Sequence, residues 1–596
     1  MDKVALQRIL SQLKFIYGDH EADLAWQKLS SRLSAVEPLI PAHLKVAKSF
    51  TQQDAILITY GDQFRQPASK PLETLVQFLD EYVGNSISAV HILPFFPYSS
   101  DDGFSVVDYT QVDPDLGSWS DILALGERYR LMFDFVLNHI SRHSDWFQKF
   151  LAHESPYEDF FIVVDPHADL SSVVRPRALP LITQVATSTT PIYVWTTFSE
   201  DQIDLNFANP EVAIRMLNIL LDYVVKNAEI IRLDAIAYLW KEIGSPCIHL
   251  PKTHHFVKLM RAVLDAVAPG VTLITETNVP HEENVSYFGE PISLQLAGEE
   301  ITRSDEAQMV YQFSLAPLVL HTFLAQNSNR LTQWAANLRT PFPEALFFNF
   351  IASHDGFGVR PAEGILSVDE VQGLVDRTIA HRGQVSYRNN PDGSKSPYEL
   401  NITLFDFLNN PAEPNPNVDM ARFLASQAIM LSLAGVPGIY VHSFFGSSNC
   451  DPCVAETGRA RSINREKFIW SDIKSQLDDS QSRASKVLSR LREMLEIRQA
   501  TPALNPSIRQ QVLQIDPNFF LLLRGEQGTN QILLVCINIS DQPIHLDLDL
   551  HSLDLEKYSQ WQDLFSGMIF PKFREVLHLE IAPYQYLWLV PPTKNQ

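Results

Sequence analysis

The sequence predicts a TIM-type (β/α)8 barrel with inserted loop subdomains and a C-terminal all-β domain. Eight short, apolar, β-rich runs alternate with helical patterns, which is typical of parallel strands that are buried on both faces. Charged residues recur at one end of these runs, where a TIM barrel builds its active site. After about residue 500 the pattern changes to short alternating strands separated by turns. From the pattern alone, an open doubly wound sheet remains an alternative.

The runs and the changes of pattern also predict the domain organisation. The eight runs are residues 55–59, 87–93, 131–136, 229–234, 271–276, 309–313, 346–351 and 438–442. We expect a helical extension over residues 1–50, a barrel over 51–500, insertions at about 140–210 and 364–413, and a β domain over 501–596. The insertions follow the third and seventh strands, show no regular helical pattern, and are of the kind that usually bears function.

Composition excludes several classes of protein. Lys and Arg number 47 against 70 Asp and Glu, a net charge of −23, which argues against non-specific binding to nucleic acid or to an anionic membrane. No stretch approaches about 18 apolar residues without charge, so no transmembrane helix is expected. The first 17 residues carry Lys3, Arg8 and Lys14 and indicate an amphipathic helix instead of a signal peptide. Together with only four cysteines, this predicts a cytoplasmic protein.

The pair Cys450 and Cys453 has the CxxC spacing of redox motifs and of half a metal site. No second CxxC occurs in the sequence, and the flanking residues are typical of a loop. We therefore expect two loop thiols.

Two acids at the ends of neighbouring runs are the minimum equipment for cleaving a glycosidic bond. Asp234 ends the fourth run and Glu276 the fifth. Adjacent strands lie about 4.8 Å apart, which is compatible with the roughly 5–5.5 Å separation of a retaining pair of carboxyl groups. The sequence therefore predicts a nucleophile and a general acid/base at these two positions.

Neighbouring residues at the strand ends suit these roles. Arg232 lies two residues before Asp234, on the same face of the strand, where its charge would keep the nucleophile ionised. Glu276 must hold a proton near neutral pH, which requires burial or a nearby like charge, and Asp355 supplies a third acid. His139 and His354 can donate hydrogen bonds to sugar hydroxyls, and Asp134 orients its neighbours.

Metal binding is the competing interpretation of such a cluster. No HxxxH or HExxH spacing occurs among these residues, and Arg232 would oppose a cation. We expect no metal and no cofactor.

Four short segments carry a resemblance to a known family. They are residues 133–139 (FDFVLNH), 231–234 (IRLD), 274–276 (ITE) and 352–355 (ASHD). In this order, each at a strand end, they resemble the conserved regions of the α-amylase family, glycoside hydrolase family 13. The resemblance implies that Asp234 is the nucleophile, Glu276 the general acid/base and Asp355 the transition-state stabiliser.

Within that family the sequence resembles the sucrose phosphorylase subgroup over nearly its whole length. The matching segments are residues 91–97 (HILPFFP), 101–104 (DDGF), 175–177 (RPR), 195–198 (WTTF), 202–204 (QID) and 463–465 (INR). The resemblance implies that Asp101 and Arg465 grip the far hydroxyls of a terminal glucose and so favour exo-action on a disaccharide. It makes Phe198 an apolar platform, places Gln202 near the acid/base and makes Tyr238 a pocket residue. Core packing is the alternative for Phe198 and Tyr238, and a solvated loop for Gln202.

The same resemblance implies a phosphate-binding arginine in the segment 175–177. We assign it to Arg175, with Arg177 as the second choice, because a guanidinium can bind phosphate in bidentate fashion. An interdomain salt bridge is the alternative. Residues 176–183 and 398–405 look closer to members that act on glucosylglycerate or sucrose 6′-phosphate, and the loop 409–419 should border the acceptor site.

We therefore expect a retaining phosphorylase that transfers glucose from a small α-glucoside, such as sucrose or one of these related glucosides, to inorganic phosphate. A hydrolase or transglucosidase of the same family is the first alternative, and a catalytically silent carbohydrate-binding barrel the second. The Asp101 and Arg465 pattern disfavours endo-action on starch. Acceptor identity and oligomeric state stay open.

Overall fold

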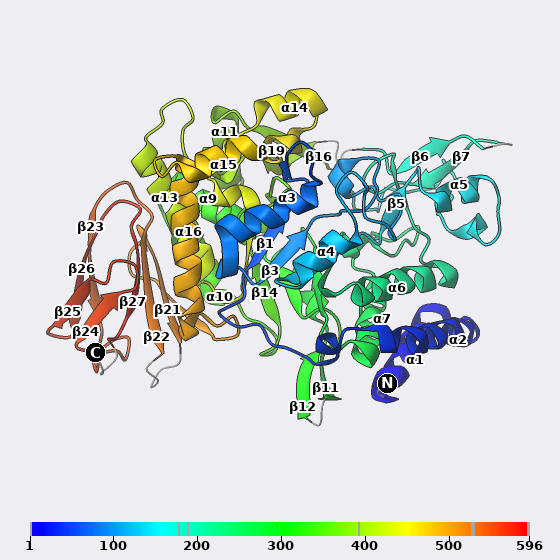
Figure 1. The fold of residues 1–596 in the computed structure, drawn as a ribbon, viewed down its shortest axis with the longest axis horizontal. Helices are drawn as coiled ribbons and strands as arrows, with labels where there is room; N and C mark the ends of the chain where they lie inside the picture. Colours follow the sequence, from blue (N-terminus) through cyan, green and yellow to red (C-terminus); the bar gives the residue numbers. More distant parts are fainter. Residues whose placement is uncertain are drawn as a thin grey trace.

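The computed structural model describes residues 3–176, 179–187, 190–296, 299–390, 394–525 and 531–592. Its centre is a closed barrel of eight parallel strands, which confirms the predicted fold class (Figure 1). In chain order the strands are β1 (Ile56–Thr59), β3 (Ala89–Ile92), β4 (Arg130–Phe135), β9 (Ala228–Leu233), β10 (Thr272–Thr275), β13 (Met309–Tyr311), β14 (Leu346–Asn349) and β18 (Val436–Tyr440). Each overlaps one of the eight apolar runs. Strand order in the barrel follows chain order, and β18 closes it against β1.

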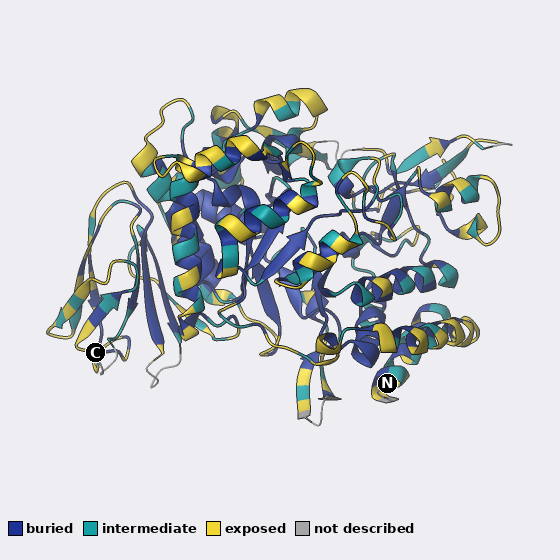
Figure 2. Cartoon of the chain, in the orientation of Figure 1, coloured by how far each residue is buried: buried dark blue, intermediate teal, exposed yellow. Residues whose placement is uncertain are grey.

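Both faces of the barrel strands are covered, as their apolar sequences require. The inside is filled by side chains and the outside is covered by helices, so the barrel strands are buried except at Arg130, the half-buried first residue of β4 (Figure 2). Helices between and after the strands are α3 (Pro71–Phe78), α4 (Trp119–Gly126), α6 (Pro210–Val225), α7 (Pro251–Val267), α8 (His281–Val285), α9 (Leu315–Ala325), α10 (Asn329–Asn337), α13 (Pro416–Ser432), α15 (Trp470–Asp478) and α16 (Arg483–Gln499). Several begin with proline in the first turn, where its missing N–H costs no helical hydrogen bond. None of the helices in the described part of the chain combines the length and apolar character that a bilayer crossing needs.

The N-terminal segment forms α1 (Lys3–Tyr17) and α2 (Asp19–Val36), which dock on the outside of the barrel helices. Helix α1 packs against α7, and α2 packs against α6. Buried Ile9 and Leu13 lie four residues apart on the inner face of α1, the spacing of one helix face. Arg8 adds an ion pair to Asp265 with an N–O distance of 2.7 Å. The apolar face of the N-terminal amphipathic helix is therefore the face that packs against the barrel helices.

The insertions follow β4 and β14 and lie at the top of the barrel in Figure 1. The first contains β5 (His139–Ser141), α5 (Asp145–Leu151), β6 (Ile182–Val185), β7 (Ile192–Trp195) and β8 (Gln202–Asp204). The second contains β15 (Phe357–Gly358), α11 (Val368–Ala380), β16 (Gln384–Asn389), β17 (Lys395–Asn401) and α12 (Leu404–Leu408). The expectation of insertions without regular helices was wrong for α11, which begins at a capping box between Ser367 and Glu370. A hairpin of β11 (Pro291–Leu296) and β12 (Glu299–Ser304) projects from the opposite side of the barrel.

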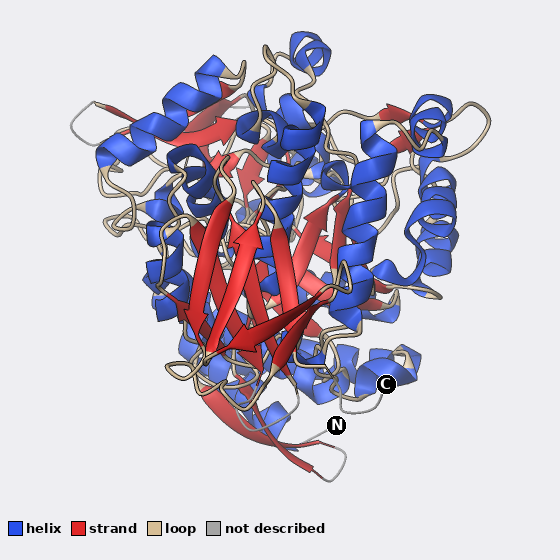
Figure 3. Ribbon diagram, turned by 90° about the vertical axis from the view of Figure 1, so that its left-hand side faces the viewer, coloured by secondary structure: helices blue, strands red, loops and turns tan. Residues whose placement is uncertain are grey.

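The C-terminal region is an eight-stranded antiparallel sheet, seen face-on in Figure 3. Its strands are β20 (Gln510–Leu513), β21 (Phe519–Gly525), β22 (Ile532–Asn538), β23 (Ile544–Asp549), β24 (Gln560–Asp563), β25 (Ile569–Phe573), β26 (Val576–Ile581) and β27 (Tyr586–Val590). Helices α10 and α13 of the barrel contact strands β20, β21 and β22. A short pair, β2 (Phe64–Arg65) and β19 (Phe468–Ile469), ties the segment after β18 back to the first barrel loop.

The prediction of two loop thiols at Cys450 and Cys453 was wrong. The residues form a disulfide at the start of helix α14 (Asp451–Thr457), where their Cα atoms lie 5.3 Å apart, within bonding range. The first helical turn brings residues three apart onto one side, which the flanking loop-like sequence concealed. Cys450 also donates its N–H to the carbonyl of Ile463, so the disulfide lies beside the segment that carries Arg461 and Arg465.

Candidate active site

The acids predicted from the strand ends meet in one cavity at the carboxyl ends of the barrel strands. Asp234 follows β9 directly and Glu276 follows β10 directly. Among the residues that line this cavity are Asp101, Phe104, His139, Phe198, Gln202, Arg232, Asp234, Tyr238, Glu276, His354, Asp355, Tyr398, Glu399 and Arg461. We call it the active-site cavity. The side chains of residues 234 and 276 therefore converge, as the sequence analysis required.

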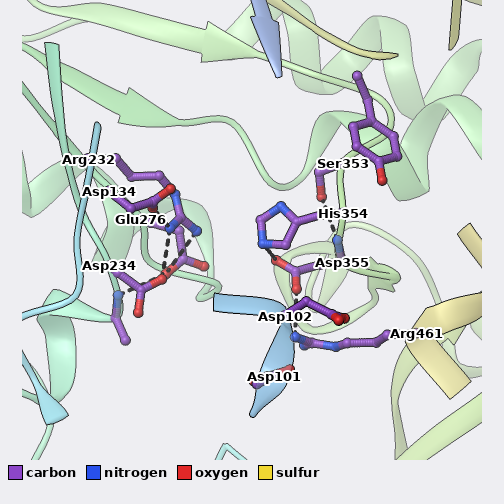
Figure 4. A network of polar contacts seen from close by, with 12 residues as sticks. Asp101, Asp102, Asp134, Arg232, Asp234, Glu276, Ser353, His354, Asp355 and Arg461 are labelled. Carbon is purple, nitrogen blue, oxygen red and sulfur yellow. Dashed lines mark hydrogen bonds and ion pairs between the residues drawn. The ribbon is translucent and has the colours of Figure 1, made fainter. Parts of the chain in front are cut away.

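Arg232 is the buried centre of the first group of charges. Its side chain is 1% exposed, and it contacts Asp134, Asp234 and Glu276 (Figure 4). The shared strand face predicted from the sequence places its Nη1 2.8 Å from Oδ1 of Asp234. Asp134 also pairs with Nε2 of His91 at 2.7 Å. Burial would raise the pKa of Asp134, but Arg232 and His91 together hold that pKa at about 2, so Asp134 is a permanent anion that orients Arg232.

The carboxyls of Asp234 and Glu276 differ in their contacts with Arg232. Burial raises the pKa of both Asp234 and Glu276, and Arg232 opposes the rise at each. Arg232 donates a hydrogen bond to Asp234 at 2.8 Å but lies 3.9 Å from Glu276. The charge of Asp355 raises the pKa of Glu276 further. The guanidinium therefore stabilises the ionised form of Asp234 more than that of Glu276, whose Oε2 accepts the N–H of Ala235 at 3.0 Å.

Asp355 lies in a second group of charges, between His354 and Arg461 (Figure 4). Nη1 of Arg461 is 2.6 Å from Oδ1 of Asp355. The other edge of the same guanidinium binds Glu399 in bidentate fashion, with Nε to Oε2 at 3.0 Å and Nη2 to Oε1 at 2.8 Å. Glu399 is buried on β17, so this Glu399–Arg461–Asp355 clamp joins the second insertion to the third acid.

The clamp sets the charge of Asp355. Burial raises its pKa, but Arg461, followed by His354 and Arg465, holds that pKa well below its usual range. Burial also lowers the pKa of His354 to about 3, so its imidazole is neutral at neutral pH and keeps one N–H donor. An ionised carboxylate beside a neutral donor suits the recognition of sugar hydroxyls and of a developing positive charge.

The apolar and amide side chains predicted from the resemblance also line the cavity. The ring of Phe198 lies edge-on to Tyr238 at a centroid distance of 5.5 Å and 5.3 Å from the ring of His139. Gln202 is buried on β8 and donates to the carbonyl of Phe104 at 3.2 Å, so it is not a solvated loop residue. Nε2 of Gln202 is 3.2 Å from Nε2 of His139. These positions fit the predicted contacts with a sugar.

The expected pair of Asp101 and Arg465 is arranged differently. Nη1 of Arg465 lies 2.6 Å from Asp102 and 3.8 Å from Asp101. Asp101 and Asp102 both have positive φ, 55° and 50°, in a short turn that brings two carboxylates towards one guanidinium. Asp101 lines the active-site cavity, whereas Arg465 lines a neighbouring one.

Of the two predicted phosphate-binding arginines, the structure describes only Arg175. Arg175 is exposed and is absent from the described lining of the active-site cavity, although the next residue, Pro176, lies in that lining. Arg177 lies outside the described residues. The loop 409–419, expected to border the acceptor site, lines a separate cavity together with Phe405 and Arg483.

Sequence reasoning missed Arg461, Glu399, Tyr398 and Asp102. Arg461 precedes Arg465 by four residues, and Tyr398 and Glu399 begin a segment already singled out for its resemblance, so these were the available signals. Their contacts depend on how the second insertion folds back over the barrel, which no local pattern reports.

A parallel barrel with a buried arginine and three acids at its strand ends defines a glycoside-processing enzyme. Residues 74–356 match the α-amylase catalytic domain. The chain is 46% identical to the glucosylglycerate phosphorylase of Allomeiothermus silvanus, over 90% of this chain and 93% of that protein. It is 43% identical to the glucosylglycerate phosphorylase of Spirochaeta thermophila (98% and 99% covered) and 44% identical to that of Escherichia coli K12 (92% and 96%). The chain therefore belongs to the α-amylase family, in the subgroup that contains the sucrose and glucosylglycerate phosphorylases.

Solved structures agree on the fold. The sucrose 6F-phosphate phosphorylase of Thermoanaerobacter thermosaccharolyticum superposes with a TM-score of 0.69 at 24% identity, over 83% of this chain and 95% of that one. An α-amylase from H. orenii superposes with a TM-score of 0.64 at 17% identity, over 91% and 100%.

Proposed function

We propose that the chain is a retaining phosphorylase that transfers the glucosyl group of glucosylglycerate to inorganic phosphate, giving α-glucose 1-phosphate and glycerate. The observation that carries the reaction is the convergence of Asp234 and Glu276 on one cavity beside Arg232. The identity of 43–46% to three proteins named glucosylglycerate phosphorylase supports the acceptor, because the relatives named sucrose phosphorylase are 26–29% identical.

The reaction is a double displacement. The ionised carboxylate of Asp234 attacks the anomeric carbon, and the bond from that carbon to the glycerate oxygen breaks as Glu276 gives its proton to this oxygen. An oxygen of phosphate then attacks the anomeric carbon of the glucosyl ester, Asp234 departs, and the carboxylate of Glu276 accepts the proton of the incoming phosphate. Two inversions at one carbon leave the α configuration in the product.

The neighbouring residues have supporting roles in this proposal. Asp355 stays ionised and stabilises the positive charge that develops on the sugar ring in the transition state. His139 and His354 donate hydrogen bonds to glucosyl hydroxyls, Phe198 packs against the sugar, and Tyr238 and Gln202 close the cavity around it. Asp101, held by Arg465, contacts the far hydroxyls. Arg175, with Arg177 as the second choice, orients phosphate. No cofactor takes part.

The test compares three glucosides, namely glucosylglycerate, sucrose and sucrose 6′-phosphate, each with and without phosphate. We expect phosphate-dependent formation of glucose 1-phosphate, fastest with glucosylglycerate. Release of glucose at the same rate without phosphate would establish a hydrolase instead, and faster turnover of sucrose would overturn the acceptor. The matched negative control is Asp234→Asn, which keeps the size of the side chain and removes the nucleophile.

The proposal includes a cytoplasmic location, supported by the low cysteine content and by the burial of Cys247 and Cys536 as free thiols. The disulfide between Cys450 and Cys453 weighs against a reducing compartment. Thiol titration of protein purified without added oxidant or reductant measures whether Cys450 and Cys453 are bonded. Free thiols at these positions would support a reducing compartment, and a disulfide would oppose it.

A further inference from the structure

Three exposed side chains gather on one face of the C-terminal sheet. They are His545 and Asp547 of β23 and His578 of β26, two strands that lie at the left end of the molecule in Figure 1, away from the barrel. Each side chain offers one metal-ligating atom, and the three atoms lie within 4.8 Å of one another. In the described part of the chain, this is the one group of three or more histidine, cysteine or acidic side chains that meets this condition. We call it the histidine cluster.

Strand pairing brings the histidine cluster together. His545 and Asp547 are two residues apart on β23, so they point to the same face of the sheet. Asp547 lies directly opposite His578 on the antiparallel neighbour β26. Residues opposite each other on neighbouring strands have Cβ atoms about 4.5–5.5 Å apart, which lets both imidazoles reach one carboxylate. Because Asp547 and His578 are 31 residues apart in the chain, no local sequence pattern indicates the cluster.

Both imidazoles contact the same carboxylate oxygen. Nε2 of His545 lies 3.2 Å and Nδ1 of His578 lies 2.7 Å from Oδ1 of Asp547. The two rings are nearly parallel, with an interplanar angle of 26° and centroids 6.2 Å apart. In a tetrahedral zinc site with bonds of about 2.0–2.1 Å, neighbouring ligand atoms lie about 3.3 Å apart. The three atoms are therefore close to the spacing that one ion requires, and small rotations of exposed side chains suffice to reach it.

The surroundings of the histidine cluster favour a cation. Neither β23 nor β26 contains a lysine or an arginine. The exposed face of these strands also presents Asp549 and Glu580, and Glu580 lies directly opposite His545. On the next strand, β25, Lys572 lies opposite Leu577, which belongs to the buried face. The net charge of −23 attracts cations to the protein as a whole.

We propose that the histidine cluster binds a divalent transition-metal ion with the ligand preference of Zn²⁺, through Nε2 of His545, Nδ1 of His578 and a carboxylate oxygen of Asp547. Imidazole and carboxylate are typical zinc ligands, whereas Mg²⁺ and Ca²⁺ prefer oxygen ligands alone. Water or Glu580 completes the coordination. β23 is the edge strand of the sheet, so an ion that bridges it to β26 fastens that edge. The site is independent of the proposed function.

The test titrates ZnCl₂ by calorimetry into full-length protein that has been treated with EDTA and dialysed. We expect one Zn²⁺ per chain in the wild type. His578→Ala should weaken binding about a hundredfold or more, because losing a direct ligand costs at least as much as losing a hydrogen-bond partner of a ligand. His545→Ala is the second variant and should do the same. The matched control is His551→Ala, which removes an exposed histidine of the same domain that lies 3.9 Å from Glu556 and should keep the wild-type affinity.

The variants should fold as the wild type does, since the three side chains are exposed and their ion pairs contribute little to stability. Equal melting temperatures of the metal-free proteins check this. A wild-type protein that binds no Zn²⁺ overturns the inference, as does wild-type affinity in both His545→Ala and His578→Ala. Equally tight binding of MgCl₂ would show a general acidic surface and would also overturn it. One Zn²⁺ per two chains, with dimer formation, would place the ion between copies and overturn the single-chain site.

Hydrogen exchange tests the fastening of the edge strand. The amides of β23 should exchange more slowly in the wild type with Zn²⁺ than without it, because the ion opposes local opening of the strand. His578→Ala should show no such difference. Exchange in the wild type that Zn²⁺ leaves unchanged would overturn the bridging of β23 to β26.

Discussion

The Glu399–Arg461–Asp355 clamp predicts a large effect of a residue that is not one of the three acids. Arg461→Met removes one charge-assisted contact to Asp355 at 2.6 Å and a bidentate contact to Glu399. Each such hydrogen bond contributes about 1.5–3 kcal/mol, and the part that positions Asp355 acts directly on the transition state. Losing about 3 kcal/mol of transition-state stabilisation lowers kcat/KM roughly a hundredfold.

The assay is the formation of glucose 1-phosphate over a range of pH. Because Arg461 lowers the pKa of Glu276, its removal should raise that pKa. The rate falls as pH rises and Glu276 loses its proton, so this alkaline limb should move to higher pH in Arg461→Met. Arg461→Lys should have a rate between those of Arg461→Met and the wild type. One ammonium can contact Asp355 or Glu399, but it cannot make the bidentate contact that a guanidinium makes with a carboxylate.

A purely structural role for Arg461 would give another result. A lowered melting temperature, with the activity of the folded protein within twofold of the wild type and an unmoved alkaline limb, would refute the reasoning. Arg382→Met serves as the control for removing a guanidinium, because its pair with Asp451 is exposed and should contribute little.

Three further predictions concern the nucleophile, acid stability and packing. Asp234→Asn should lower kcat about 10⁴-fold or more at an unchanged melting temperature, and ordinary turnover in that variant would refute its role as nucleophile. Asp134 has a folded-state pKa of about 2 against an ordinary 3.8, so it contributes roughly 2 kcal/mol to stability above pH 4, and this contribution is lost as pH falls towards 2. Urea unfolding of the wild type should therefore give a lower free energy of unfolding at pH 3 than at pH 5. Equal free energies at the two pH values would contradict the prediction. Gly438→Ala on β18 would place Cβ 2.2 Å from the ring of Phe348 and should cost about 1–3 kcal/mol, so an unchanged melting temperature would show that the barrel interior can yield there.

The barrel could be predicted because its signal is local. Residues 55–58 (AILI), for example, are apolar without interruption, which is typical of a strand covered on both faces. The positions of Asp234 and Glu276 could be predicted from the same runs, because residues at the carboxyl ends of barrel strands lie at the face where a TIM barrel builds its active site. Arg232 follows from strand alternation, and the structure places it 2.8 Å from Asp234.

Contacts made across insertions could not be predicted in this way. Glu399 lies 62 residues from Arg461 and reaches it only because β17 pairs with β15 and β16 above the barrel. Arg465 lies closer to Asp102 than to Asp101 because both aspartates have positive φ in a short turn. The identity of these two residues does not predict that backbone conformation. The disulfide between Cys450 and Cys453 was not predicted because it depends on a single helical turn at the start of α14, and the flanking sequence is typical of a loop.

The most direct test of the account follows the anomeric configuration of the first product. Wild-type protein is mixed with glucosylglycerate and excess phosphate, and the product is monitored by ¹H and ³¹P NMR before mutarotation or hydrolysis can intervene. The account predicts α-glucose 1-phosphate as the first product, formed together with an equal amount of glycerate. β-Glucose 1-phosphate, or free glucose formed at the same rate whether or not phosphate is present, would contradict it.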